Sequence, residues 1–500
     1  MIDQKQKHKG ILLPVFSLPS RTGIGCFSEE AYAFIDFLEK AGQDAWQILP
    51  LGPIDLWHSP YQPCSAFAGE PLYIDPEKLA EEGLLTSEEM TEYCDAVGIT
   101  DRVVYEVLVP AKKGLLKKAY DKAIRLNDGS YLKEFALFKE KNKGWLDDYC
   151  LFIALHKEQK DKPWTGWDEP LRSRDPRALD QAKNTLAQAI DYAAWLQFEF
   201  FRQWQSLRDY AGGHGIRIIG DMPYYMTLDS VECWKRPELF QLDADYRPKV
   251  ISGVPGDKFN SAGQIWGSPV YNWADRKEEM ICWWQERIRR GFDFYDALRI
   301  DHARAFEACY AIPAEDPDAR NGHWEKAAGA QVFASFSREI EEERLIAEDL
   351  GMITEDVRQM MRESGLPGLA VLQFAFDSGK DNPYRPANIR PATVVYTGTH
   401  DNNTTTGWYQ DLRGRRRWRV RWYFRKARRG TVTEKMIRAA FDSQARLAII
   451  PLQDHMGLSG EARINTPGTT EGNWNWRLDP SLLTDELAEK IRMISAVSGS

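Results

Sequence analysis

The stretch Ala297-Leu-Arg-Ile-Asp-His302 decides the fold, because a short apolar run ends at once in charged and polar side chains. Two further stretches, Leu345-Ile-Ala-Glu-Asp-Leu350 and Val394-Val-Tyr-Thr-Gly-Thr-His-Asp401, repeat this pattern. A parallel α/β barrel presents catalytic groups in this way, since each strand fixes the backbone and its carboxyl end opens into the active-site face. Three acids placed like this indicate chemistry on glycosidic bonds.

A single acid at a strand end is more often solvated than catalytic, so the pattern depends on the set. Arg299 and Asp301 are two residues apart, and a strand therefore turns both toward the same face. An arginine beside a carboxylate holds the carboxylate ionised. An ionised Asp301 has the charge that a nucleophile needs.

Short apolar runs bounded by glycine, proline or acids predict eight strands. They cover residues 10–15, 45–51, 216–221, 297–301, 345–349, 369–376, 393–398 and 447–452. Helical patterns lie between several of them, at 28–41, 278–290, 332–343 and 354–364. Strands that alternate with helices favour a parallel sheet, and eight strands predict a (β/α)₈ TIM barrel.

The spacing of these runs predicts one barrel domain over 1–500, with insertions at about 55–210 and 225–290 and no separate C-terminal β domain. The first insertion carries charged helical stretches at 107–126 and 130–140 and an aromatic-rich helix at 180–210. We therefore expect helical subdomains that grow out of barrel loops, on the face where loops carry function.

Composition limits the partners and the compartment. The net charge of −9 and the pI near 5.6 argue against nucleic acid, whose binding relies on lysine and arginine. The eighteen tryptophans and twenty tyrosines offer flat faces for a neutral sugar. No apolar run reaches membrane length, which predicts no membrane partner. The seven scattered cysteines lack any Cys-x-x-Cys pair, which disfavours disulfides and a zinc site and favours the cytoplasm.

The segment 413–429 has the most unusual local composition, with nine arginines and lysines among four aromatic residues from Arg415 onward. Taken alone it is compatible with an RNA-binding stripe. The favoured interpretation is a helix, because Trp418 and Trp422 are four residues apart and would cover one face while arginines solvate the other.

Several strings in the loops give the chain a nearly end-to-end resemblance to the 4-α-glucanotransferase family, also called amylomaltase or disproportionating enzyme. The strings are Ser59-Pro-Tyr-Gln-Pro-Cys-Ser-Ala-Phe-Ala-Gly-Glu-Pro-Leu-Tyr73, Gly220-Asp-Met-Pro223, Trp234-Lys-Arg-Pro-Glu-Leu-Phe240, Gly263-Gln-Ile-Trp-Gly267, Arg299-Ile-Asp-His302, Ala347-Glu-Asp-Leu-Gly351, Thr397-Gly-Thr-His-Asp-Asn402 and residues 467–477 around Gly472-Asn-Trp474. Several independent strings in one order make the resemblance specific.

The resemblance implies a retaining double displacement on α-1,4-glucans without a cofactor or metal. Asp301 would be the nucleophile, Glu348 the acid and then the base, and Asp401 the residue that grips the reacting sugar. A retaining pair of carboxyl groups sits about 5–5.5 Å apart. Glu348 must be protonated at rest, so its pocket should raise its pKa. Asp349 faces the other way on a strand and is expected to be a structural acceptor.

The same resemblance implies a set of substrate-binding residues. His302 and His400 would bind sugar hydroxyls, although a satisfied buried histidine is the alternative for each. Arg299 would tether Asp301. Ser59, Tyr61 and Asp221 would line the same sugar site, while Gln264, Trp266 and Asn473 would shape the acceptor side. Core packing is the alternative for Tyr61 and Trp266.

The chain departs from the family pattern at three places. Ala303-Arg304-Ala305 stands where the family usually has Phe-Arg-Gly, and Ala327-Ala-Gly329 replaces Gly-Pro-Gly. Asn403 stands where an acid is common. None of these positions is a proposed catalytic acid, so the departures concern the shape of the substrate loops and turnover.

The sequence therefore predicts an enzyme that passes a piece of a maltooligosaccharide to another glucan or to glucose. An α-1,4-glucan hydrolase differs only in using water as the acceptor. A catalytically impaired glucan-binding protein is the alternative from another class, and the three intact acids count against it. A monomer or a weak homodimer is expected.

Overall fold

The computed structural model describes residues 7–55, 57–256, 261–427 and 429–496. Its main sheet has eight parallel strands in the order β10-β11-β12-β1-β2-β3-β6-β9. The strands are β1 (His8–Leu12), β2 (Ala45–Gln47), β3 (Arg217–Met222), β6 (Ala297–Ile300), β9 (Leu345–Ala347), β10 (Gly368–Val371), β11 (Thr393–Tyr396) and β12 (Leu447–Pro451). Each lies in or overlaps one of the eight predicted runs, so the predicted barrel is confirmed.

The barrel closes between β9 and β10, the two ends of the sheet order. The Ala347 N–H donates to the Pro367 carbonyl at 2.9 Å. The Leu369 N–H, in β10, donates to the Asp349 carboxylate at 2.6 Å. A side chain here replaces a backbone carbonyl of the ladder. Asp349 is thus a structural acceptor, as expected once the family resemblance assigns the pocket to Glu348.

Alternate residues of the strands pack on opposite sides of the sheet. In β12, Leu447 and Ile449 belong to a buried cluster inside the barrel, whereas Ala448 and Ile450 pack outward in a second cluster. The inner cluster takes at least one residue from each of the eight strands. The barrel interior is therefore a packed core, and its carboxyl ends are left to carry the site.

Helices surround the barrel, as the alternating pattern predicts. They include α1 (Glu29–Lys40), α10 (Lys277–Phe294), α13 (Glu355–Ser364), α14 (Thr405–Asp411), α16 (Val432–Asp442), α17 (Leu452–Met456) and α18 (Asp485–Ser495). The helix expected at 332–343 is broken into α11 (Gly329–Phe333) and α12 (Ser337–Glu341) by a 3₁₀ turn. After β12, the described residues up to Ala496 form helices and turns without a further strand.

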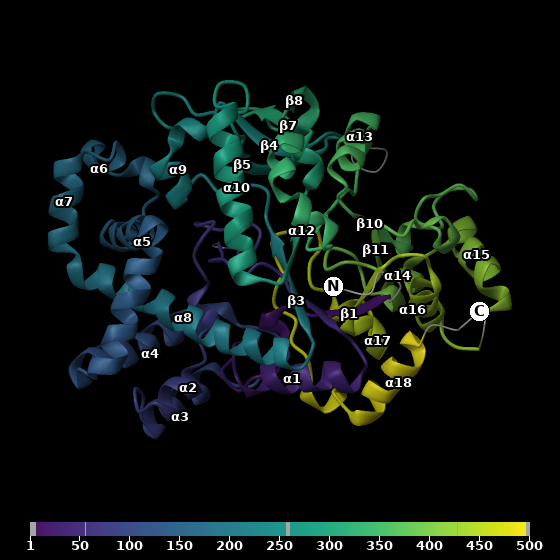
Figure 1. The fold of residues 1–500 in the computed structure, drawn as a ribbon, viewed down its shortest axis with the longest axis horizontal. Coiled ribbons are helices and arrows are strands. Elements are labelled where there is room, and N and C mark those ends of the chain that lie inside the picture. The colour runs from purple at the N-terminus through teal and green to yellow at the C-terminus, as the bar shows by residue number, and fades with distance from the viewer. Residues whose placement is uncertain (1–6, 56, 257–260, 428, 497–500) are drawn as a thin grey trace.

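The first insertion is helical. Its helices are α2 (Pro76–Glu81), α3 (Ser87–Val97), α4 (Tyr105–Leu126), α5 (Gly129–Glu158), α6 (Glu169–Arg172), α7 (Pro176–Thr185) and α8 (Ala187–Gly213). In Figure 1 the helices α4 to α7 form the blue lobe at the left, α2 and α3 lie at the bottom, and α8 runs back toward the barrel beside α1. The single helix expected at 180–210 is two helices, because the chain leaves helical geometry at Leu186.

The second inserted region departs from the expected helical pattern. It contains α9 (Val231–Lys235) and the strands β4 and β5, which join β7 and β8 from after β6 in a four-stranded antiparallel sheet of order β5-β4-β7-β8, at the top of Figure 1. The strands are β4 (Val250–Val254), β5 (Gln264–Pro269), β7 (Ala308–Pro313) and β8 (His323–Lys326). The sheet joins residues from both sides of β6, and β5 carries Gln264 and Trp266.

The arginine-rich segment forms the helix α15 (Gly414–Tyr423), followed by a 3₁₀ turn, and Arg428 lies outside the described residues. The expected packing of its tryptophans is wrong. Trp418 is 62% exposed and Trp422 is 44% exposed, and the two rings stack on each other. Val420 and Phe424 make the buried contacts instead, because they lie on the opposite side of the helix from both tryptophans.

All seven cysteines are free thiols in the structure. Among the described residues, no helix combines the length and apolarity that crossing a bilayer requires.

Candidate active site

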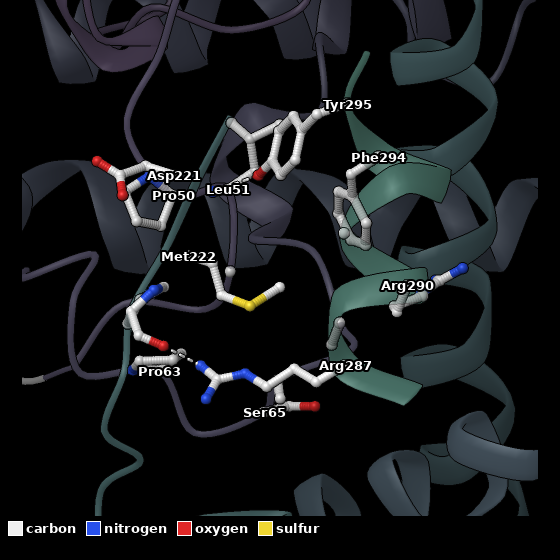
Figure 2. A pocket seen from close by; sticks show the side chains of 15 residues that line it. Pro50, Leu51, Pro63, Ser65, Asp221, Met222, Arg287, Arg290, Phe294 and Tyr295 are labelled. Atoms are coloured by element: carbon white, nitrogen blue, oxygen red, sulfur yellow. Dashed lines mark hydrogen bonds between the residues drawn. The ribbon is translucent and has the colours of Figure 1, made fainter. Parts of the chain in front are cut away.

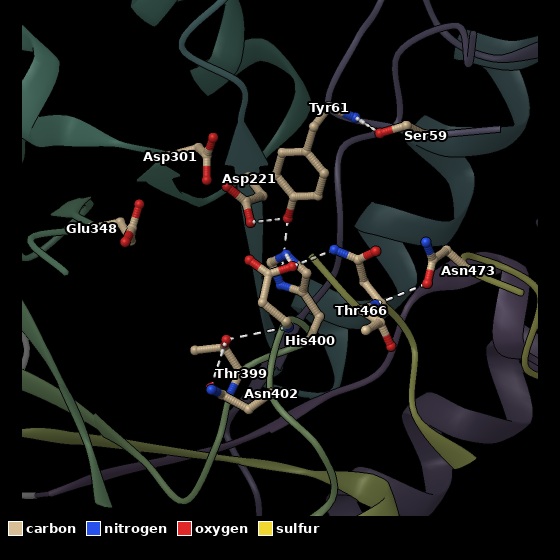
Figure 3. Close-up of polar contacts among 12 residues, drawn as sticks. Ser59, Tyr61, Asp221, Asp301, Glu348, Thr399, His400, Asn402, Thr466 and Asn473 are labelled. Atoms are coloured by element: carbon tan, nitrogen blue, oxygen red, sulfur yellow. Dashed lines mark hydrogen bonds and ion pairs between the residues drawn. The ribbon is translucent and has the colours of Figure 1, made fainter. Parts of the chain in front are cut away.

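Two acids lie immediately after neighbouring strands of the barrel. Asp301 comes after β6, and its N–H donates to the Met222 carbonyl at 2.9 Å. Glu348 comes after β9, and its N–H donates to the Ile300 carbonyl at 3.0 Å. The hydrogen-bond ladder thus continues up to both residues and fixes their backbone. Figure 3 shows their carboxyl groups side by side, facing Asp221 and Tyr61.

Arg299 is the cation that these acids share. It lies on the inward face of β6 and is 3% exposed. Its Nη1 donates to Asp221 and, at 3.4 Å, to Asp301, while its Nη2 is 3.9 Å from Glu348. One buried guanidinium therefore contacts carboxylates from β3, β6 and β9, which is possible because its five N–H donors spread in a fork.

Burial raises the pKa of both Asp301 and Glu348, and Arg299 opposes this shift. The pKa of Glu348 rises to about 8 and that of Asp301 to about 7. Arg299 is closer to Asp301 than to Glu348. As the pair loses protons, Asp301 is therefore the first to ionise and Glu348 keeps its proton longer. This order suits a nucleophile beside a general acid.

His302 holds Glu348 through its backbone. The residue adopts a left-handed conformation with φ of 47°, and its N–H donates to Glu348 Oε2 at 2.6 Å. This leaves Oε1 of Glu348 for other chemistry. Burial lowers the pKa of His302 to about 3, so its ring is neutral. The ring meets Trp266 edge to face with centroids 4.7 Å apart.

Tyr61 and His400 form the opposite wall. The Tyr61 hydroxyl donates to Asp221 at 2.8 Å, and its ring stacks on His400 with centroids 5.0 Å apart. Ser59 orients Tyr61, because the Ser59 hydroxyl accepts from the Tyr61 N–H at 3.2 Å. Burial lowers the pKa of His400, which favours the neutral ring. Figure 3 shows these side chains in one connected group.

Asp401 lies in the loop after β11 and has partners that the sequence reasoning missed. Asn465 donates to its Oδ1 at 2.6 Å, and Arg463 donates to its backbone carbonyl at 2.6 Å. His400 Nε2 is 3.4 Å from the same carboxylate. Arg463 and Asn465 come just before the string that begins at Pro467, and their proximity to that string was the only signal in the sequence.

Among the described residues, the side chains of Gln264 and Asn473 make only local hydrogen bonds. Gln264 accepts from the Trp266 indole N–H at 3.3 Å. Asn473 accepts from the Thr466 N–H at 2.9 Å and donates to the Thr469 carbonyl at 2.9 Å, so it shapes its own loop. In Figure 3, Asn473 lies on the far side of His400 from Asp301. The structure therefore gathers the other predicted site residues and leaves these two at the periphery.

Two of the three departures from the family pattern, at residues 303–305 and at Asn403, are accommodated locally. Ala303 and Ala305 are fully buried, and the Ala303 N–H donates to the Glu348 carbonyl at 3.0 Å. Asn403 donates from its side chain to Asp411 at 3.1 Å. An acid at position 403 would face Asp411 with like charge, so the amide suits this neighbour.

A small cavity lies behind Asp221, between β3 and α10 (Figure 2). Its volume is about 50 Å³, far below the several hundred Å³ of a typical ligand pocket. Arg287, 1% exposed, reaches across it and donates to the Pro223 and Tyr224 carbonyls. The cavity is therefore a packing gap beside β3, where Arg287 holds the chain that follows the strand. In the described part of the chain, no cluster of three or more His, Cys, Asp or Glu side chains could hold a metal ion.

Comparison with known proteins agrees with this geometry. A family model described as 4-alpha-glucanotransferase matches residues 13–484. A 4-alpha-glucanotransferase of Thermus thermophilus is 42% identical over 97% of this chain and 97% of its own length. One from Clostridium butyricum is 39% identical over 97% of this chain and 99% of its own.

A solved structure agrees as well. The amylomaltase of Streptococcus agalactiae in complex with acarbose superposes with a TM-score of 0.93 at 35% identity, covering 98% of this chain and 99% of that chain. The family model, the relatives and this fold span nearly the whole molecule. The chain belongs to the 4-alpha-glucanotransferase family.

Proposed function

We propose that Asp301, Glu348 and Asp401 share the work of a retaining double displacement in this 4-α-glucanotransferase. The substrates are α-1,4-glucans and maltooligosaccharides, and the acceptor is another glucan or glucose. The observation that carries the proposal is the contact of one buried Arg299 with Asp221, Asp301 and Glu348. This arrangement gives two adjacent carboxyl groups different protonation tendencies.

In the first half-reaction, Glu348 gives its proton to the glycosidic oxygen while an oxygen of Asp301 attacks the anomeric carbon. The glycosidic C–O bond breaks, an ester to Asp301 forms, and the leaving glucan departs. In the second, Glu348 takes the proton from an acceptor hydroxyl, whose oxygen attacks the same carbon and releases Asp301. Asp401 binds hydroxyls of the reacting sugar throughout.

Two buried polar atoms support sugar binding at the wall of the site. Asp221 Oδ1 and His302 Nε2 have no hydrogen-bond partner among the described residues. Leaving such atoms unpaired costs free energy, and a bound sugar hydroxyl can satisfy either one. Trp266, which packs on His302, then offers an aromatic face on the acceptor side.

The test is product analysis with maltotriose. A transferase gives glucose and a ladder of longer oligosaccharides, a hydrolase gives shorter sugars only, and a binding protein gives no change. Asp301→Asn should abolish turnover with the fold intact, because a nearly isosteric amide cannot form the ester. Near-normal transfer by Asp301→Asn would show that the nucleophile is assigned wrongly. We further expect a cytoplasmic protein that is a monomer or a weak homodimer. Sedimentation of the pure protein checks the oligomeric state.

A further inference from the structure

Asp454 is a buried acid that the reaction does not use directly. It lies in α17, immediately after β12, and is 2% exposed. Its Oδ2 accepts from the Thr397 hydroxyl at 2.5 Å and from the Thr405 hydroxyl at 2.6 Å. Its Oδ1 accepts from the Thr405 N–H at 2.7 Å. All three donors come from two residues.

Those two residues bracket the loop that carries His400 and Asp401. Thr397 is the first residue after β11, and Thr405 is the first residue of α14. One carboxylate therefore fastens both ends of the segment 397–405. The other side of the segment is held by Gln373, in the 3₁₀ turn that follows β10, whose side chain donates to the Asn403 carbonyl at 2.8 Å. The loop is thus gripped from both neighbouring strands.

The Asp454 carboxylate is buried and is held by hydrogen bonds alone among the described residues. Burial raises the pKa of Asp454, and the bonds from Thr397 and Thr405 oppose the shift. No ion pair to Asp454 is found among the described residues, so two hydroxyls and one N–H stabilise its buried charge. A buried carboxylate costs free energy that an apolar residue would not. Because the carboxylate binds both Thr397 and Thr405, it fixes the distance between the two ends of the loop.

We propose that Asp454 is a positioning residue that fixes the loop 397–405 so that Asp401 meets the reacting sugar. The inference rests on the proposed role of Asp401. A loop held at both ends keeps the Asp401 carboxylate in the place where Asn465 and His400 contact it. A misplacement of about 1 Å in such a group can reduce turnover by roughly a hundredfold.

The first experiment compares Asp454→Ala with Asp454→Asn in maltotriose disproportionation, below the unfolding transition of each variant. We expect Asp454→Ala to lower kcat/KM by about 10- to 100-fold, with the loss mainly in kcat. Asp454→Asn should recover most of the activity. Its amide oxygen can accept the Thr405 N–H, while the threonine hydroxyls rotate to accept from its NH₂ group.

The second experiment is a double-mutant cycle with Asp401→Asn. Once the Asp401 carboxylate is gone, its position no longer matters, so Asp454→Ala should add less than about a twofold further loss. Losses that multiply in full would overturn the proposal, because independent effects add in free energy. Asp75→Ala is the matched control. Asp75 is also a buried carboxylate, 1% exposed, but it caps α2. Its loss should leave the Asp401→Asn effect unchanged.

Further outcomes are decisive in the same way. Full kcat/KM in folded Asp454→Ala would overturn the proposal. If that variant does not fold, Thr405→Val removes one hydroxyl with little change of shape, and the same pattern of loss and non-additivity should appear in reduced form. Normal turnover in Asp401→Asn would overturn the proposed role of Asp401 and, with it, this positioning role. Loss in Asp401→Asn with full activity in Asp454→Ala would overturn the positioning role alone.

Discussion

Arginine has two opposite uses in this molecule. Arg299 is buried at the carboxyl end of the barrel and contacts three carboxylates. The arginines of α15 lie on the surface, where Arg415 and Arg421 are exposed. The difference teaches that the value of a charge depends on burial, since water screens a surface charge and a buried one must be matched by partners. Sequence composition drew attention to α15, whereas the proposed reaction depends on the single buried arginine, Arg299.

The largest expected effect comes from removing the buried cation. Arg299→Gln leaves Asp221, 2% exposed, without its ionic partner. We expect a loss of about 3–5 kcal/mol in the free energy of unfolding, together with loss of turnover, because breaking a buried pair strands a charge. Arg421→Gln on α15 is the matched control and should change stability by less than about 0.5 kcal/mol. Urea denaturation of both variants gives the comparison, and equal stabilities would contradict it.

The barrel could be predicted because each strand carries its own signal. Short apolar runs such as the one that ends at Asp301 need no distant information, and their alternation placed Arg299 on the inward face. The sheet β5-β4-β7-β8 gave no such signal. Its strands β4, β5 and β8 are partly exposed and are not continuous apolar runs, and its pairing joins segments from both sides of β6. That pairing depends on contacts that are distant in sequence.

The site was predictable where a motif lies at a strand end, as for Asp301 and Glu348. The sequence did not predict the roles of Asp454, Asn465 and Gln373. These residues contact the loop after β11 from other segments, and nothing near them in the sequence indicates which loop they contact. The prediction of which face of α15 packs on the core was wrong for a related reason. Spacing places Trp418 and Trp422 on one face, but only the tertiary structure shows that Val420 and Phe424 meet the core.

Replacing Glu348 should have a smaller effect on stability than Arg299→Gln, and it should stabilise the fold instead of destabilising it. Burial raises the pKa of Glu348 to about 8. A raised acid pKa means that the fold disfavours the ionised form, so its contribution to stability is present below about pH 4 and is lost as pH rises through 8. Glu348→Gln should therefore raise the Tm by a few degrees at pH 8.5 and leave it nearly unchanged at pH 4.

Activity gives the second measurement of the same variant. Glu348→Gln should lose about 10²–10⁴-fold in turnover of maltotriose but far less with α-glucosyl fluoride, whose leaving group needs no proton. For the unaltered enzyme, kcat/KM should rise as Asp301 ionises near pH 7 and fall as Glu348 loses its proton near pH 8. Equal losses on both substrates would argue against the acid role, as would a Tm difference that does not depend on pH.

The smallest effect on stability is expected from changes to α15, because its exposed side chains contribute little to the free energy of unfolding. Trp418→Ala with Trp422→Ala removes two rings that stack on each other and leave much of their surface in water. We expect a change below about 0.5 kcal/mol in unfolding and no change in maltotriose turnover. Val420→Ala, on the buried face of the same helix, should cost about 0.5–3 kcal/mol and serves as the control. If the tryptophan variant loses as much stability as Val420→Ala, the rings support the fold after all. Salt-sensitive binding of single-stranded RNA that disappears in Arg415→Gln with Arg421→Gln would instead favour the nucleic-acid interpretation, because such binding depends on cation contacts to phosphates.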